Sequence, residues 1–268
     1  MRLNLSVLIP TLNNARGLKH LLEFFKDKEI QVVVVDNKPS KERNSYITIL
    51  LNCYKERLIY LPQKKNLGFA IAVNHAFKYV NTKWTLILND DIEFPNDQLI
   101  NQLYKYAENK KIDALSPILI NPNGEVENYG YKIFPYGKIS LVKELTSLRV
   151  NELDGLTAAC LLVKTSVFKR LEGFDESFFA YLEDVDFFLR FKKTGYKMAI
   201  SKNIKVLHNH MTTSKTMGNF KARQDMINWW RLYFKFRNRF KFDIVFVVER
   251  FRNFSGFVKA TFSNFFST

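Results

Sequence analysis

The first third of the chain alternates short apolar runs with helix-like segments, and this alternation restricts the fold more than any other feature. The run at 31–35 contains four consecutive valines, a near-continuous apolar pattern typical of a parallel strand that is covered on both faces. We expect strands at 5–9, 31–35, 58–60 and 84–88, with helices at 15–26 and 69–80. Strand–helix alternation implies right-handed crossovers and a parallel sheet, so the chain is predicted to be an α/β protein.

The middle of the chain is less regular. A turn at 121–124 (Asn-Pro-Asn-Gly) indicates a hairpin. Residues 211–219 are polar without apolar periodicity, which suggests a loop or lid. The other expected elements are strands at 113–120, 156–163 and 198–207, and helices at 166–171 and 184–194.

Acidic residues follow two of the predicted parallel strands. Asp36 ends one strand, and Asn89, Asp90 and Asp91 directly follow another. In open α/β sheets, ligands bind outside the carboxyl ends of the strands. Hard cations such as Mg²⁺ take carboxylate and phosphate oxygens, so two adjacent carboxylates here suit a cation that neutralises a diphosphate. The simpler alternative is a polar turn or a helix cap.

A second acidic group, Glu183-Asp184-Val185-Asp186, precedes a helical pattern. Acids at a helix N-terminus stabilise the helix dipole by about 0.3–1 kcal/mol, which would explain the group without any function. Asp186 and Arg190 also have the spacing of an ordinary i,i+4 pair. The functional interpretation makes Asp184 a general base that takes a proton from an attacking hydroxyl, with Glu183 binding the acceptor.

Two of the four histidines, His208 and His210, close the last predicted strand. A neutral imidazole can complete a metal site that is otherwise built from carboxylates. Each histidine can equally be an ordinary polar residue. We favour His208 over His210 as a ligand.

The charge of the chain favours an anionic partner. It has 41 Lys and Arg against 26 Asp and Glu, a formal net charge of +15. Such an excess suits nucleic acid, phospholipid headgroups or phosphorylated substrates. Cys53 and Cys160 are too few and too distant for a disulfide framework, which favours a reducing compartment. We see no signal peptide and no run near the roughly 18 apolar residues that span a bilayer, so we expect a cytoplasmic protein or one on a membrane surface.

The segment from Phe220 differs from the rest. It contains 12 of the 25 Phe, and its 10 basic and 3 acidic residues contribute +7 of the net charge. Apolar residues spaced by three or four predict an amphipathic helix with a basic polar side: Ile244, Val247, Phe251, Phe254, Val258, Phe262 and Phe265. This helix would bind a membrane, pack on the catalytic domain or form a dimer interface.

The motifs along residues 5–210 resemble the inverting family 2 glycosyltransferases of the GT-A fold, and within them the rhamnosyltransferase-like branch. Each motif is weak alone, and the resemblance lies in their order and spacing. They are SVLIPTLN at 6–13, VVVDN at 33–37, NLGFA at 66–70 with Asn74, LNDD at 88–91, and GFDESFF at 173–179 running into YLEDVD at 181–186.

The resemblance implies a role for each matching residue. Asp36 would contact the base, Asp90 the ribose or sugar, and Asp91 a cation that is Mn²⁺ or Mg²⁺. Asp184 matches the catalytic base, Glu183 would contact the acceptor, and His208 falls where several relatives supply a histidine to the metal. The full implied donor-binding set is Thr11, Asn13, Asp36, Asn66, Gly68, Asn74, Asp90 and Asp91. The reaction would be a single displacement that inverts the anomeric carbon.

We therefore expect a metal-dependent glycosyltransferase that uses a dTDP- or UDP-sugar. The acceptor would be a lipid-linked glycan in lipopolysaccharide, O-antigen or capsule assembly, reached at the inner membrane face through residues 220–268. The catalytic domain would cover 1–215, with a nucleotide-sugar half to about 112, followed by a helical tail at 216–268.

Two other functions fit parts of the sequence. A non-catalytic basic protein would bind nucleic acid or a membrane surface through the aromatic tail, but no nucleic-acid motif is visible and we expect no nucleic-acid partner. A sugar nucleotidyltransferase would need a Gly-rich basic opening loop, and Pro10-Thr11-Leu12-Asn13 stands there instead.

Overall fold

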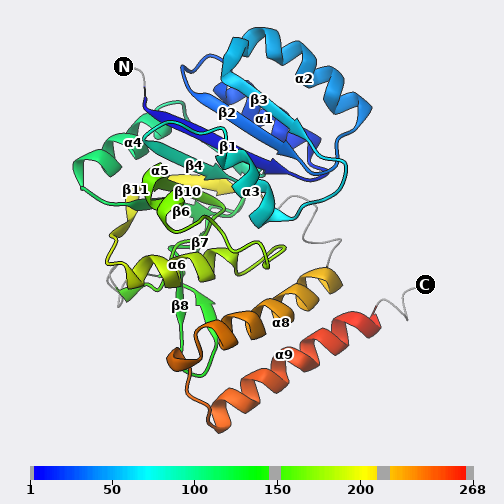
Figure 1. The fold of residues 1–268 in the computed structure, drawn as a ribbon, viewed down its shortest axis with the longest axis vertical. Helices are drawn as coiled ribbons and strands as arrows, with labels where there is room; N and C mark the ends of the chain where they lie inside the picture. Colours follow the sequence, from blue (N-terminus) through cyan, green and yellow to red (C-terminus); the bar gives the residue numbers. More distant parts are fainter. Residues whose placement is uncertain (1–2, 145–151, 210–217, 264–268) are drawn as a thin grey trace.

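The apolar runs of the sequence form the centre of one mixed sheet, in a computed structural model that describes residues 3–144, 152–209 and 218–263 (Figure 1). Across the described residues the strands are ordered β3 (Leu58–Pro62), β2 (Gln31–Asp36), β1 (Leu5–Thr11), β4 (Trp84–Leu88), β10 (Cys160–Lys164), β6 (Ala114–Ile120), β11 (Met198–His208) and β5 (Ile92–Glu93), with β7 (Val126–Asn128) beside β6. The predicted α/β architecture with a mostly parallel sheet is confirmed.

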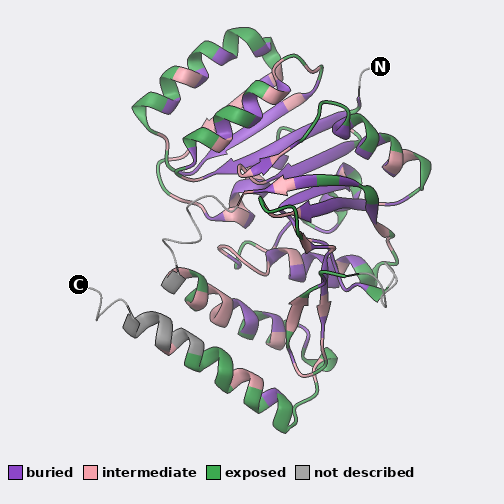
Figure 2. Ribbon diagram, turned by 180° about the vertical axis from the view of Figure 1, so that it is seen from behind, coloured by how far each residue is buried: buried purple, intermediate pink, exposed green. Residues whose placement is uncertain are grey.

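The position of β2 between β3 and β1 explains why its sequence is almost continuously apolar. Side chains of a strand alternate between the two faces of the sheet. Val32 and Val34 pack into the core on one face, and Val33 and Val35 pack into the core on the other. All four are fully buried, as Figure 2 shows for most of the sheet. The valine run therefore records burial on both faces.

Helices cover each face of the sheet. One core cluster joins it to α1 (Ala15–Phe25), α2 (Lys41–Tyr54, followed by the short turn η1, Lys55–Arg57) and α4 (Leu99–Asn109). The other cluster joins it to α3 (Phe69–Phe77), α5 (Thr165–Arg170) and α6 (Glu183–Lys193). Each core is closed by the apolar stripe of amphipathic helices, as expected for this architecture.

Some predicted elements differ from the observed ones. The strand expected at 156–163 begins only at Cys160, because residues 158 and 159 form a turn just before it. It runs antiparallel to both β4 and β6, where alternation alone predicts parallel neighbours. The helices α2 and α4 were not anticipated, and the helix expected at 69–80 ends at Phe77.

The start of the tail packs on the core of the sheet and its helices. Leu232 of α8 (Gly218–Lys235) and Phe236, the residue that follows this helix, belong to one of the two core clusters. The side chain of Asn228 donates hydrogen bonds of 2.8 Å to the carbonyls of Ala180 and Tyr181, just before α6. The boundary predicted at residue 216 stays a prediction, since residues 210–217, with His210 and most of the expected lid, lie outside the described part of the chain.

An ion pair also fastens α8 to α6, and a second pair within α6 shares the same carboxylate. The fully buried Asp186 lies 2.6 Å from Nζ of Lys235 and 2.8 Å from Nη2 of Arg190. A buried carboxylate needs such partners to remain charged. Asp186 therefore has a structural role, which includes the i,i+4 pair with Arg190 that its spacing indicated.

The last helix, α9 (Ile244–Ser263), follows the turn η3 (Arg237–Arg239) and lies beside α8 (Figure 1). It contacts α8 through Phe246, which is buried against Trp229 and Tyr233. The described members of the predicted apolar face point away, and Ile244 and Phe251 are 74% and 73% exposed. Phe262 and Phe265 lie outside the residues whose side chains are described. No helix in the described ranges is long and apolar enough to cross a membrane.

Candidate active site

A cavity of about 1000 Å³ lies at the carboxyl ends of β1 and β4 and extends to α8 and α9. A small two-stranded sheet, β8 (Tyr131–Ile133) and β9 (Ile139–Leu141), contributes to its wall. Eight of the residues proposed from the sequence line this one cavity: Thr11, Asn66, Gly68, Asp90, Asp91, Glu183, Asp184 and His208. Side chains up to 197 positions apart in the chain thus meet in one place, which is what a catalytic site requires.

At the end of β4, Asp90 holds two segments of the sheet edge together. Its carboxylate accepts hydrogen bonds from the hydroxyl of Thr11 at 2.5 Å and the amide of Asn14 at 3.1 Å. Burial raises the pKa of Asp90 to about 7. Gly17 permits this close packing, because a Cβ there would lie 1.9 Å from the carbonyl oxygen of Asp90. The ribose or sugar contact of Asp90 stays a prediction.

The next residue, Asp91, meets His208 from the end of β11. Oδ1 of Asp91 lies 3.2 Å from Nε2 of His208, and Nδ1 of His208 lies 2.8 Å from Oε2 of Glu127. Burial lowers the pKa of His208, but the two carboxylates outweigh it and raise that pKa to about 9. A histidine between two carboxylates is therefore built into the cavity wall.

Asp91 and His208 fit a divalent cation. The buried Oδ1 of Asp91 accepts no aligned hydrogen bond from the described residues, although Nε2 of His208 is close. An imidazole nitrogen and a carboxylate oxygen are suitable ligands for Mn²⁺, and Mg²⁺ typically takes one or two carboxylates plus substrate phosphates and water. The described residues contain no group of three His, Cys, Asp or Glu that could hold a metal, so the remaining ligands would come from the donor diphosphate and water.

Glu127, which sequence reasoning missed, orients His208. Histidine ligands commonly pair their second ring nitrogen with a carboxylate, and loss of such a partner costs about 10–100-fold in metal affinity. We therefore expect Glu127→Gln to weaken Mn²⁺ binding by about 10–100-fold, measured by titration calorimetry. Glu125→Gln, in the exposed turn two residues earlier, is the matched control. Equal Mn²⁺ affinities for both variants would contradict the orienting role.

Asp184 reaches the cavity from the first turn of α6. Tyr181 and Leu182, just before it, both have left-handed backbone conformations, with φ of 69° and 65°. Such conformations cost about 1–3 kcal/mol in residues other than glycine and recur at functional sites. They bring the chain into α6 in an orientation that exposes Asp184 to the cavity.

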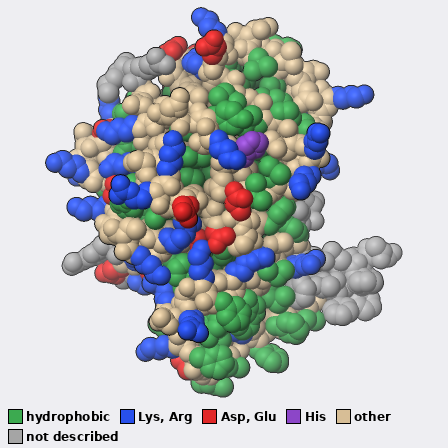
Figure 3. Space-filling view, viewed as in Figure 1, with side chains coloured by type: hydrophobic (Ala, Val, Ile, Leu, Met, Phe, Trp, Pro, Cys, Tyr) green, Lys and Arg blue, Asp and Glu red, His purple; other side chains and the backbone are tan. Residues whose placement is uncertain are grey.

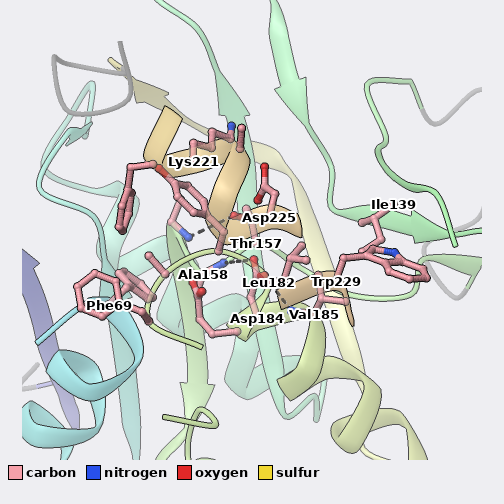
Figure 4. Close-up of a pocket in the computed structure, with 18 of the residues that line it drawn as sticks. Phe69, Ile139, Thr157, Ala158, Leu182, Asp184, Val185, Lys221, Asp225 and Trp229 are labelled. Atoms are coloured by element: carbon pink, nitrogen blue, oxygen red, sulfur yellow. Dashed lines mark hydrogen bonds between the residues drawn. The ribbon is translucent and has the colours of Figure 1, made fainter. Parts of the chain in front are cut away.

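Two backbone amides hold the carboxylate of Asp184 in place. The amide of Val185 donates to Oδ1 at 2.8 Å, and that of Ala158 donates to Oδ2 at 3.2 Å (Figure 4). Burial raises the pKa of Asp184 to about 6 in spite of these hydrogen bonds. At neutral pH it is a fixed, ionised carboxylate that can accept a proton, as a general base must.

Glu183 lies beside Asp184 and has a different protonation preference. Burial, and then the negative charge of Asp184, raise the pKa of Glu183 well above its usual value. Its Oε2 has no hydrogen-bond partner among the described residues. The raised pKa of Glu183 favours its protonated form, in which it would donate a hydrogen bond beside the carboxylate of Asp184.

Three predicted donor residues do not line the cavity. Asp36 is buried at the end of β2 and its Oδ2 lies 3.0 Å from Nε of Arg43, so its base contact stays a prediction. Asn13 is exposed, and its backbone turns with a φ of 57°. The side chain of Asn74 joins α3 to the backbone of Phe174.

Gly68, by contrast, is needed for the cavity wall. Its φ is 80°, and a Cβ there would lie 2.2 Å from the carbonyl oxygen of Phe179. The amide of Phe69 donates to that same oxygen at 2.7 Å. Gly68 therefore lets the turn at the start of α3 pack directly on the segment that leads into α6.

The tail helices supply cavity residues that the sequence did not reveal. Lys221, Asp225 and Trp229 of α8 line the cavity together with Asp184 (Figure 4). Burial raises the pKa of Asp225, and Lys221 opposes this. Arg250 of α9 lines the same cavity. The spacing of four residues between Lys221, Asp225 and Trp229 indicates that they share one face of a helix. That this face lines the cavity is shown only by the way α8 packs on the rest of the protein.

Comparisons with known proteins show the family of the chain. Residues 6–172 match the family model described as Glycosyl transferase family 2. The low-salt glycan biosynthesis hexosyltransferase Agl10 of Haloferax volcanii is 25% identical over 247 residues, which cover 88% of this chain and 74% of that protein. The N-acetylglucosaminyl-diphospho-decaprenol L-rhamnosyltransferase of Mycobacterium tuberculosis is 25% identical over 177 residues, covering 56% of this chain and 58% of that protein.

A solved structure supports the fold. The mannosyltransferase PcManGT from Pyrobaculum calidifontis, in complex with GDP-Man and Mn²⁺, has a TM-score of 0.64 and 15% sequence identity to this chain. The match covers 97% of this chain and 74% of that one. At this identity the likeness shows a shared fold.

Proposed function

The chain belongs to glycosyl transferase family 2 and is a glycosyltransferase; from this premise we propose that it moves a sugar from a nucleotide-diphospho-sugar to a hydroxyl of a lipid-linked glycan, with inversion at the anomeric carbon. The observation that carries the proposal is the position of Asp184 in one cavity with Asp91 and His208. A fixed base and a cation-binding pair are the two parts that such a displacement needs.

The proposed chemistry is a single step. Asp184 takes the proton of the acceptor hydroxyl while that oxygen bonds to the anomeric carbon and the bond from this carbon to the diphosphate oxygen breaks. Protonated Glu183 donates a hydrogen bond to the acceptor and so orients the attacking group. A divalent cation held by Asp91 and His208 would neutralise the charge that develops on the departing nucleotide diphosphate.

Nucleotide binding tests this proposal directly. We expect one of UDP, dTDP, GDP and CDP to bind in calorimetric titrations with Mn²⁺ and to bind much more weakly with EDTA. The nucleotide that binds would identify the donor class, for which dTDP and UDP are our candidates. Absence of binding by all four to the folded protein would refute the transferase proposal and favour a non-catalytic basic protein.

The acceptor proposal draws on the tail and on the relatives. The mycobacterial relative is named for a sugar on diphospho-decaprenol, a lipid carrier. The exposed apolar residues of α9, together with the +7 charge of the tail, suit an anionic membrane surface, where each Lys or Arg contributes about 1 kcal/mol. In Figure 3, hydrophobic side chains gather over the start of α9. The unpaired cysteines suit the reducing, cytoplasmic side.

Substitution of the exposed α9 face tests the membrane contact. Phe251 and Phe254 are 73% and 53% exposed, so the double change Phe251→Asp, Phe254→Asp removes apolar surface without opening the core. We expect it to reduce binding to vesicles containing phosphatidylglycerol by at least tenfold in a sedimentation assay, because apolar contact is lost and the two added carboxylates are repelled by the anionic surface.

The matched control is Ile49→Asp. Ile49 is 66% exposed on α2, at the opposite end of the molecule (Figure 1), and its change should leave vesicle binding intact. If the α9 variant instead converts a dimer to a monomer in light scattering and still binds vesicles normally, the face is a dimer interface and the membrane proposal is wrong. Deletion of the whole tail is a poorer test, because α8 carries core residues.

A further inference from the structure

The cavity continues past Asp184 to a rim formed by the tail and the β8–β9 turn. Its lining includes Lys138 from that turn, Trp229 from α8, and Glu249, Arg250 and Arg252 from α9. In Figure 4, Asp184 lies between Phe69 on one side and Ile139 and Trp229 on the other. Phe69 belongs to the donor half of the site, so the rim lies on the side from which an acceptor would approach.

Arg250 is the central group of this rim. Its guanidinium carbon lies 3.4 Å from the centre of the Trp229 ring, and Nη2 donates a hydrogen bond of 3.2 Å to the carbonyl of Gly137. Its Nε is buried and has no hydrogen-bond partner among the described residues. Burial lowers the pKa of Arg250 to about 10, so it remains charged at neutral pH.

A charged guanidinium in this position lacks an acidic partner within the described chain. Glu249 is adjacent, but its carboxylate pairs with Arg252 at 3.1 Å. The side chains of Lys138, Arg250 and Arg252 outnumber that single carboxylate, leaving a net charge of +2 at the rim. A partly buried polar group without a partner is costly, and a bound anion would remove that cost.

We propose that this rim binds the diphosphate of the lipid-linked acceptor, and the inference rests on the transferase function proposed above. Arginine suits this role because its planar fork pairs with two phosphate oxygens at once. Stacking on Trp229 fixes the plane of the fork, so less freedom is lost on binding. The donor diphosphate belongs at Asp91 and His208, and the rim is a second anion site for the other substrate.

The placement also explains how a membrane-bound substrate reaches Asp184. Arg250 and Phe246 face α8, whereas Phe251 and Phe254 lie on the outer face of the same helix. A lipid whose tail stays in the membrane beside α9 would therefore bring its diphosphate to Arg250. The sugar attached to that diphosphate would then extend towards Asp184.

The test uses geranyl diphosphate as a short, soluble probe, titrated calorimetrically into the full chain with EDTA present so that the cation site is not engaged. We expect binding that geraniol does not reproduce. Arg250→Gln should weaken it at least tenfold, and Arg250→Lys should weaken it less, because it keeps the charge and loses the fork. Lys138→Gln, an exposed change that cannot disturb the core, should weaken it severalfold.

Arg237→Gln is the control, since it removes the same charge from an exposed turn of the tail away from the cavity lining. Equal losses for Arg237→Gln and Arg250→Gln would mean a diffuse charge effect and overturn the site. A matching loss of binding to phosphatidylglycerol vesicles by Arg250→Gln would mean that the rim binds membrane headgroups instead. Unchanged probe binding by Arg250→Gln and Lys138→Gln would also overturn it.

The outcome is separable from that of the transferase proposal. Nucleotide binding with Mn²⁺ reports on Asp91 and His208 and does not involve the rim. If a nucleotide binds and geranyl diphosphate does not, only the acceptor-diphosphate site is wrong. If no nucleotide binds, the transferase proposal is wrong, whatever the result with geranyl diphosphate.

Discussion

Replacing Asp184 with Asn is expected to lower kcat for sugar transfer by about 10²–10⁴-fold while donor binding stays unchanged. The amide cannot accept the proton of the acceptor hydroxyl, but its shape still fills the space beside Ala158. The measurement is single-turnover transfer from the nucleotide-sugar identified by titration, together with the affinity for that nucleotide. Turnover like that of the unaltered protein would remove Asp184 from the catalytic role.

The pH profile gives an independent check on the same base. Asp184 must be ionised to accept a proton, and burial raises its pKa to about 6. Below that pH the protonated fraction grows, so log kcat/KM should fall with a slope of one as the pH decreases from about 6. The profile of Asp184→Asn should lack this limb.

Asp225→Asn is the matched control for Asp184→Asn. Asp225 is another partly buried carboxylate in the cavity, and its negative charge helps to keep Glu183 protonated. Its substitution should change acceptor KM more than kcat, and it should leave the pH limb near 6 in place. Loss of that limb in Asp225→Asn instead would identify Asp225 as the titrating base.

Replacing Asp91 with Ala should abolish the effect of Mn²⁺ on nucleotide binding. In the unaltered protein we expect Mn²⁺ to strengthen binding at least tenfold, or about 1.4 kcal/mol, because the diphosphate and the carboxylate share one cation. Without the carboxylate of Asp91, His208 alone binds the cation too weakly to hold it beside the diphosphate. Paired titrations with Mn²⁺ and with EDTA measure the difference.

Asp97→Ala provides the comparison for Asp91→Ala. The side chain of Asp97 is 80% exposed and lies on another part of the surface, paired with Lys28. It should retain the full Mn²⁺ effect. Retention of that effect by Asp91→Ala as well would exclude Asp91 as a metal ligand and leave the pair with His208 as a structural contact.

Much of the fold could be predicted because local patterns record burial. The valines of β2 indicated a strand covered on both faces, and the structure buries them all. The helix α2 was missed although Ile47, Leu50 and Tyr54 follow helical spacing, because its other positions mix polar and apolar residues. The antiparallel insertion of β10 could not be predicted, since strand order depends on contacts between distant segments.

The tail shows the limit of reading one helix alone. The stripe through Ile244, Phe251 and Phe254 was recognised correctly as apolar, but the residue that packs on α8 is Phe246, on the other side of α9. Periodicity identifies an apolar face without identifying what covers it. The vesicle experiment distinguishes a membrane from a second copy of the chain as the partner that covers the apolar face of α9.

The sequence by itself determined the α/β class, the polar residues at the strand ends and the family, because these depend on residue types at short spacing. Only the tertiary structure brought Glu127 to His208, the amide of Ala158 to Asp184, and Arg250 to the mouth of the cavity. Each of these contacts joins residues at least 26 positions apart or on separate helices. Such contacts depend on how whole elements pack, and no local pattern encodes them.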